Sequence, residues 1–200
     1  ASLQLSTADE TVTREYKVDG GSWSSTYTAP TTDGAHTVLV RDTDVAGNQA
    51  TSAPLSFVLD KTVAAPTVAL ASDNGSSGTD KITNVGTLSI SGTETGALVE
   101  YRATVTSDWS TTAPALVQGS NTVYVRQTDA AGNISPVTRF DFTYDNQITT
   151  PTVGLATDTL GVGTTGTNSD GITKDASLQL STADETVTRE YKVDGGSWSS

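Results

Sequence analysis

Acidic residues recur along this 200-residue chain at a fixed spacing, and their oxygen atoms suit a hard divalent cation. The interval from Asp44 to Asp129 is the same as the interval from Asp60 to Asp145. Calcium binds about six to eight oxygen atoms from carboxylates, amide carbonyls, backbone and water. The pattern therefore predicts calcium sites. The candidate ligands are Asp44, Asn48, Asp60, Asp73, Asp80, Asp129, Asn133, Asp145, Asp158 and Asp170.

The same residues have a simpler interpretation as ordinary turn residues. Asp and Asn side chains bond to their own backbone, and glycine supplies a positive φ. We favour calcium for the set as a whole because three pairs of acids recur at one interval of 85 residues, namely Asp44 and Asp129, Asp60 and Asp145, and Asp73 and Asp158. Zinc is disfavoured because the chain has no cysteine and one histidine. Magnesium is disfavoured because it demands tight octahedral geometry and keeps its waters.

The acids belong to a repeated architecture. Residues 176–200 copy residues 1–25 letter for letter, so the sequence starts again at residue 176. Exact tandem copies are typical of arrays in which each unit packs mainly on its neighbours. Within the repeat two related modules alternate, named X and Y here. Residues 1–60 are a partial X that lacks its first strand, residues 61–145 a complete Y, and residues 146–200 the start of the next X.

The elements that position the acids are predicted to be strands. Residues 37–41 and 122–126 are short β-branched runs, and clusters of Gly, Asn, Asp, Ser and Thr separate such runs. We predict an all-β fold of tandem Ig-like β-sandwich modules joined end to end by short linkers. The first strand is placed at 67–71 in Y and at 152–156 in the second X. The second strand is placed at 88–91 in Y and at 3–6 in the first X.

The strand order decides where the acids should meet. In such a sandwich the loop after the first strand lies at the pole from which the chain leaves, whereas the loop before the last strand lies at the pole of entry. At the junction from Y to the next X, loop 72–81 of Y should therefore meet Asp145 and the Asp-x-Ala-Gly-Asn loop of that X module, whose copy in this chain is 44–48. At the junction from X to Y, the loop after the first strand of X, whose copy in this chain is 157–171, should meet Asp60 and loop 129–133 of Y. Three acidic loops would repel one another without a cation.

These segments also resemble a known family. The Asp-x-Ala-Gly-Asn sequence at 44–48 and 129–133, the Asp that ends each module and the Pro-Thr-Val that opens the next are similar to bacterial Ig-like tandem repeats. Such repeats form the extender region of large, type I-secreted RTX and biofilm-associated adhesins. The resemblance implies calcium near the module junctions, a location outside the cell at the bacterial surface, and a structural stalk that projects adhesive domains.

Other functions have weaker support. The alternative is an Ig-like binding module that recognises a surface glycan or protein, but the longer loop of X has no aromatic residue. No cluster of catalytic residue types stands apart from the repeat, so an enzyme is not predicted. A net charge of −12 argues against nucleic-acid binding, and no run is long enough for membrane insertion. Trp23 and Trp109 are expected to pack, while Glu15 and Glu100 are expected on a solvated strand face.

The positions at which the modules begin in this chain leave open what supplies the first strand of the X module at 1–60. Neighbouring modules of the same chain are the expected partners. The X module at 1–60 lacks a first strand, whereas residues 151–175 carry one whose module continues only to residue 200. Two explanations stay open. The chain is a window on a longer array, or one chain donates this strand head-to-tail to another.

Overall fold

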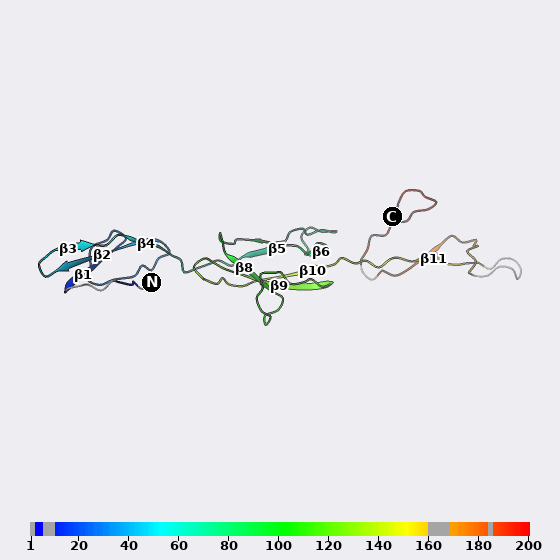
Figure 1. The fold of residues 1–200 in the computed structure, drawn as a ribbon. Coiled ribbons are helices and arrows are strands. Elements are labelled where there is room, and N and C mark those ends of the chain that lie inside the picture. Colours follow the sequence, from blue (N-terminus) through cyan, green and yellow to red (C-terminus); the bar gives the residue numbers. More distant parts are fainter. Residues whose placement is uncertain (1–2, 6–10, 160–168, 184–185) are drawn as a thin grey trace. The chain divides into compact units, whose positions relative to one another are not determined.

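A computed structural model gives the fold (Figure 1), and every element in its described part is a strand. The residues described are 3–5, 11–159, 169–183 and 186–200. They fall into two units, residues 1–145 and 146–200, which are treated separately below. Within the described ranges, no helix has the length and apolar character needed to cross a bilayer. The all-β prediction is confirmed.

The first module consists of one antiparallel sheet built around a long central strand. The strands are β1 (Val12–Val18), β2 (Gly34–Asp44), β3 (Gln49–Thr51) and β4 (Leu55–Leu59). β1 pairs along the second half of β2, while β4 pairs along its first half and β3 along its end. The predicted run at 37–41 is thus the middle of a longer strand, and β3 was not predicted.

The second module has two sheets. The smaller sheet pairs β5 with β7, and the larger has the order β6-β10-β9-β8. The strands are β5 (Thr67–Leu70), β6 (Ile82–Thr83), β7 (Leu88–Ser91), β8 (Leu98–Arg102), β9 (Gly119–Thr128) and β10 (Thr138–Tyr144). β6 runs parallel to β10, whereas the other pairs are antiparallel. The short strand β6 was not predicted.

The core of this module lies between the two sheets. Val68 of β5 is buried with Val123 and Val125 of β9 and with Phe140 and Phe142 of β10. The buried residues alternate along β9 and β10 because successive side chains of a strand point to opposite faces. Two sheets that share one apolar layer make a β-sandwich, as predicted.

The second unit repeats the start of a module. β11 (Val153–Leu155) pairs antiparallel with β12 (Leu178–Leu180). Leu3–Leu5 has the same sequence as β12, yet it forms no strand. The prediction of a strand at 3–6 is therefore wrong for the described residues 3–5, and Ser6 lies outside the described part. The physical reason is that a strand needs a hydrogen-bonded neighbour, and Leu3–Leu5 has no strand partner among the described residues.

The two glutamates on β1 and β8, Glu15 and Glu100, do not simply face solvent. Glu15 accepts a 2.7 Å ion pair from Arg41 on the facing strand, and the guanidinium of Arg41 lies 4.3 Å from the ring centroid of Trp23. Glu100 pairs with Arg126 in the same way in the second module. Each glutamate was expected to be solvated, but the cross-strand register puts an arginine directly opposite it.

Candidate metal site

Three carboxylates meet at the boundary between the first and second modules. Asp60 follows β4, Glu94 lies in the loop between β7 and β8, and Asp129 follows β9. One oxygen atom from each lies within 4.8 Å of the other two. The end of one module and two loops of the next thus supply the same cluster. Among the described residues, no lysine, arginine or histidine forms an ion pair with it.

The loop that carries Asp129 fixes its carboxylate. The backbone N–H of Asn133 donates to Oδ1 of Asp129 at 2.8 Å, and the Asn133 amide donates to Oδ2 at 2.7 Å. The side-chain hydrogen bond from Asn133 is the main cause that lowers the pKa of Asp129. Asp129 is buried, so it presents a negative charge in a poorly hydrated place. The same amide also reaches the backbone carbonyl of Asp60 at 3.1 Å.

A buried glutamine positions Glu94. The side chain of Gln127 has no exposed surface, and its Oε1 accepts a 2.9 Å hydrogen bond from the backbone N–H of Glu94. Its Nε2 donates to the carbonyls of Ala64 and Gly92, at 2.8 and 3.1 Å. Ala64 belongs to the short linker after Asp60. Gln127 therefore ties the linker to the loop that presents Glu94.

The equivalent loop of the first module has the same internal geometry. Asn48 donates to Oδ1 of Asp44 through its backbone and to Oδ2 through its amide, both at 2.8 Å. These bonds, with the side-chain bond first, lower the pKa of Asp44. Asp9 is the counterpart of Glu94 in the first module, but it lies outside the described residues. Among the described residues, the Asp44 loop belongs to no group of three acids close enough to hold a metal ion.

The acids in the loop after the first strand form turns. In the second module Asp73 accepts from the Lys81 backbone at 3.0 Å, and Asp80 accepts from Ile82 at 3.0 Å. In the second unit the corresponding bonds run from Gly171 to Asp158 at 2.9 Å and from Ile172 to Asp170 at 3.0 Å. The turn interpretation accounts for these contacts.

One atom in each of these loops is not accounted for by the turn. Oδ1 of Asp73 and Oδ1 of Asp158 are both buried without a hydrogen-bond partner in the described structure. The two residues occupy corresponding positions in their modules. Buried polar atoms are normally paired, so the same unpaired oxygen in both modules is a candidate ligand for a cation or a water. Asp145, which follows β10, is hydrogen-bonded by the amide of Gln118.

A comparison with protein families identifies the family of this chain. The model of the bacterial Ig-like domain matches residues 1–61 and, a second time, residues 62–146. The chain belongs to the bacterial Ig-like domain family. Tandem bacterial Ig-like domains are typical of surface proteins, and Ig-like domains are typically non-catalytic. No curated protein matches the sequence.

The sequence alone missed one member of the cluster in this Ig-like pair. Asp60 and Asp129 were predicted ligands that the fold brings together, whereas Glu94 was not considered. A signal was present, because the counterparts of Glu94 in the two X copies, Asp9 and Asp184, are also acidic. An acid that recurs after the second strand of each Ig-like module could have been added to the set.

Proposed function

We propose that these Ig-like modules are a calcium-stiffened spacer in a bacterial surface protein, an extender that holds adhesive domains away from the cell for adhesion and biofilm formation. The observation that carries the proposal is the cluster of Asp60, Glu94 and Asp129. Its members come from two successive modules. An ion bound there would join the end of one module to two loops of the next.

The contacts of the linker support a stiff junction. Lys61 donates to the carbonyl of Thr31, and Thr62 bonds to Asp33 at 3.2 Å, so the linker is tied to the first module. Asp60 and Ala64 accept hydrogen bonds from the second module. The linker is thus bound on both sides. A cation at the cluster would remove the remaining hinge freedom and would favour the folded state, since it binds there and binds weakly to the unfolded chain.

Calcium is the cation that fits the donor set. All three groups are carboxylates, Glu94 is exposed, and Asp60 is half-buried, so water can complete the shell of about six to eight oxygens. Three carboxylates so close together repel one another, and a divalent ion relieves that repulsion. The orphan oxygens of Asp73 and Asp158 lie in loops that the module order assigns to further junctions.

The test measures calcium binding and particle length together on the 200-residue chain. Calorimetry in calcium should give binding, and small-angle scattering should give a longer, less flexible particle in calcium than in EDTA. The Glu94→Gln variant should lose one site and part of the stiffening. Asp108→Asn is the matched control, because Asp108 is an exposed acid of the same module outside the cluster. Equal binding by wild type and the Glu94→Gln variant would contradict the assignment of this site.

A further inference from the structure

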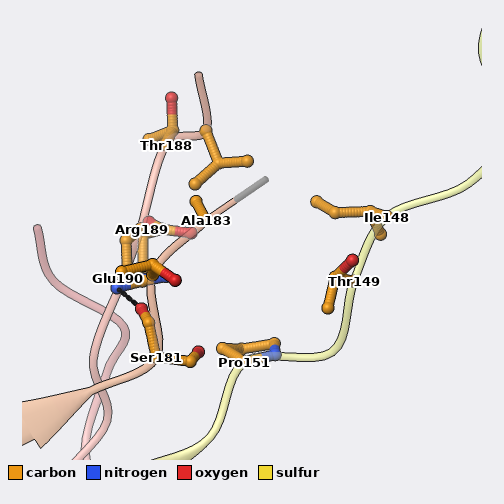
Figure 2. A pocket seen from close by; sticks show the side chains of 10 residues that line it. Ile148, Thr149, Pro151, Ser181, Ala183, Thr188, Arg189 and Glu190 are labelled. Atoms are coloured by element: carbon orange, nitrogen blue, oxygen red, sulfur yellow. Dashed lines mark hydrogen bonds between the residues drawn. The ribbon is translucent and has the colours of Figure 1, made fainter. Parts of the chain in front are cut away.

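Arg102 of β8 carries a positive charge that no acid of the described residues matches. It belongs to no ion pair, and its Nε is buried without a hydrogen-bond partner. In the second unit, by contrast, the guanidinium of Arg189 lines a pocket and donates to the carbonyl of Ser181 at 3.1 Å (Figure 2). The arginines that donate to a carboxylate or a carbonyl are Arg14, Arg41, Arg126, Arg139 and Arg189.

Two aromatic rings hold the guanidinium of Arg102 on the outer face of the larger sheet. Its central carbon lies 4.4 Å from the ring centroid of Trp109 and 5.5 Å from that of Tyr124, within the range of cation–π attraction. Tyr124 faces outward because its two neighbours on β9 point into the core. In the register of the sheet, Tyr124 lies opposite Arg102 on one side and opposite Arg139 on the other.

The acids on this face are already paired with arginines. Glu100 pairs with Arg126 at 2.9 Å, and Asp141 pairs with Arg139 at 2.9 Å. The outer face of β8, β9 and β10 thus has three arginines and two acids, and the excess charge is that of Arg102. The net charge of −12 opposes an anion at long range, but the screening length is about 8 Å at physiological ionic strength. A carboxylate in contact with Arg102 therefore meets a locally positive surface.

The X module keeps the framework of this face without its unpaired charge. Both modules have an arginine that pairs with a glutamate and stacks beside a tryptophan. The positions of Arg102, Tyr124 and Arg139 are occupied in X by Lys17, Leu39 and Pro54. The Ig-like fold therefore does not require the second ring or the unpaired arginine, and both are available for binding.

The shape of the face suits a sugar better than a peptide. β9 is hydrogen-bonded to a strand on each side, so it has no free backbone groups with which a peptide strand could pair. A shallow hollow of about 390 Å³ adjoins the face, with Lys81, Thr122 and Arg139 in its lining. The electronegative face of an aromatic ring stacks on the C–H groups of a sugar ring. A guanidinium binds a carboxylate through two parallel N–H bonds.

We propose that the outer face of β8, β9 and β10 in the Y module binds a carboxylated sugar unit. Arg102 donates to the carboxylate, Tyr124 stacks on the sugar ring, and Trp109 positions the guanidinium. Because X and Y alternate, the site recurs along an array, and weak sites that recur bind a polymer with higher avidity than one site alone. This binding goes beyond the spacer function and needs no cation.

The test is an NMR titration of the isotopically labelled 200-residue chain in EDTA, where the calcium proposal has no influence on the result. Two carboxylated probes distinguish the sources, tetragalacturonate for an acidic polysaccharide and sialyllactose for a terminal acidic sugar. At least one should shift the indole N–H of Trp109 and reach saturation. Cellotetraose, a neutral sugar, should bind at least about tenfold more weakly. No saturable shift with either probe, or equally tight binding of tetraglutamate, would overturn the proposal.

Four variants locate the site. Arg102→Gln should weaken binding by about tenfold because it removes the charge, and Arg102→Lys should weaken it less. Tyr124→Leu should also weaken binding, because it removes the ring. Lysine and leucine are the residues that X has at these positions, so the fold accommodates both. Lys17→Gln is the matched control, since it removes the same charge at the corresponding position of X and should leave binding unchanged. Equal losses in Arg102→Gln and Lys17→Gln would contradict a site on this face.

Discussion

The buried amide of Gln127 donates a 2.8 Å hydrogen bond to the backbone carbonyl of Ala64, far earlier in the chain. The bond joins the end of β9, an inner strand of the larger sheet, to the linker. The same side chain also satisfies Gly92 and the N–H of Glu94. One side chain thus serves three backbone groups around the candidate metal site.

Replacement of Gln127 by leucine should destabilise the second module strongly. Leucine has a similar volume but leaves the three backbone groups unpaired, at about 1–3 kcal/mol for each group that stays buried. We expect a loss of about 2–4 kcal/mol, because some of these groups will regain water. Hydrogen exchange of β8 and β9 in denaturant measures the change. The control is Gln118→Leu. Gln118 is an exposed glutamine of the same module whose amide bonds Asp145, and loss of that solvent-exposed bond should change stability by less than about 1 kcal/mol.

The stacked arginine of the second module should not tolerate lysine. Arg126 donates to Glu100 through Nε at 2.9 Å, and its guanidinium lies 4.2 Å from the ring centroid of Trp109. Lysine keeps the charge but loses the planar fork and the stacking, so Arg126→Lys should cost about 1 kcal/mol. Arg139→Lys is the matched control. Its ion pair with Asp141 is exposed on both sides, so it should cost about 0–0.5 kcal/mol.

Urea unfolding followed by tryptophan fluorescence compares these two variants directly, since both lie in the second module. Equal losses from Arg126→Lys and Arg139→Lys would show that the stack with Trp109 contributes nothing beyond an ordinary surface ion pair.

The first module should lose stability as the solution becomes alkaline. His36 is buried, its Nδ1 lies 2.7 Å from Asp19, and its Nε2 lies 2.8 Å from the carbonyl of Thr32. Both neighbours accept hydrogen bonds, so the doubly protonated ring fits best. The bond with Asp19 is the main cause that raises the pKa of His36 above its ordinary value of 6.5. The stabilisation is therefore complete below 6.5 and is lost as the pH rises through the folded-state pKa.

Thermal unfolding of the first module, followed between acidic and mildly alkaline pH, checks this dependence. The His36→Asn variant imports the residue that the second module has at this position, Asn121. Its melting temperature should not show the decline above pH 6.5. A decline that persists unchanged in the variant would assign the pH dependence to another group.

A glycine in the second module is closely packed against a neighbouring side chain. A Cβ on Gly86 would lie 1.8 Å from Cδ1 of Leu116, so Gly86→Ala forces that side chain to move. Overpacking of this kind should cost about 1–3 kcal/mol. The control is Gly78→Ala, where the nearest atom lies at 3.6 Å and the backbone conformation is ordinary. There, alanine should be neutral or stabilise by about 0.4–1 kcal/mol. Differential scanning calorimetry of both variants measures the contrast.

The two identical copies, 1–25 and 176–200, show which parts of the fold are local. The turn at Asp19 has a φ of 48°, and its copy Asp194 has 49°. The bridge from Tyr16 to Ser24 also recurs in the second copy. Yet residues 12–18 form β1, whereas their copies 187–193 form no strand, since they have no counterpart of β2 to pair with among the described residues. Turn chemistry is readable from a short window of sequence, but a strand depends on a distant partner.

The same distinction, between a local sequence pattern and a contact with a distant residue, applies to the candidate metal site. The repeat interval predicted Asp60 and Asp129, because both recur beside recognisable motifs. Glu94 lies beside no such motif. Only the acids at the corresponding positions, Asp9 and Asp184, mark it, and the path of the loop after β7 brings it to the other two. Its orientation depends on Gln127, a residue that reads as an ordinary strand position until its burial is seen. Long-range placement of this kind is not encoded in local spacing.

The loop after the first strand is longer in the second unit than in the second module, yet its base is unchanged. Thr83 and Thr173 each bond back to the carbonyl that precedes the first acid of the loop, at 2.9 and 2.7 Å. The insertion falls between the two acids and leaves these closing bonds in place. Evolution can therefore lengthen or diversify this loop, one repeat at a time, without refitting the strands that it connects.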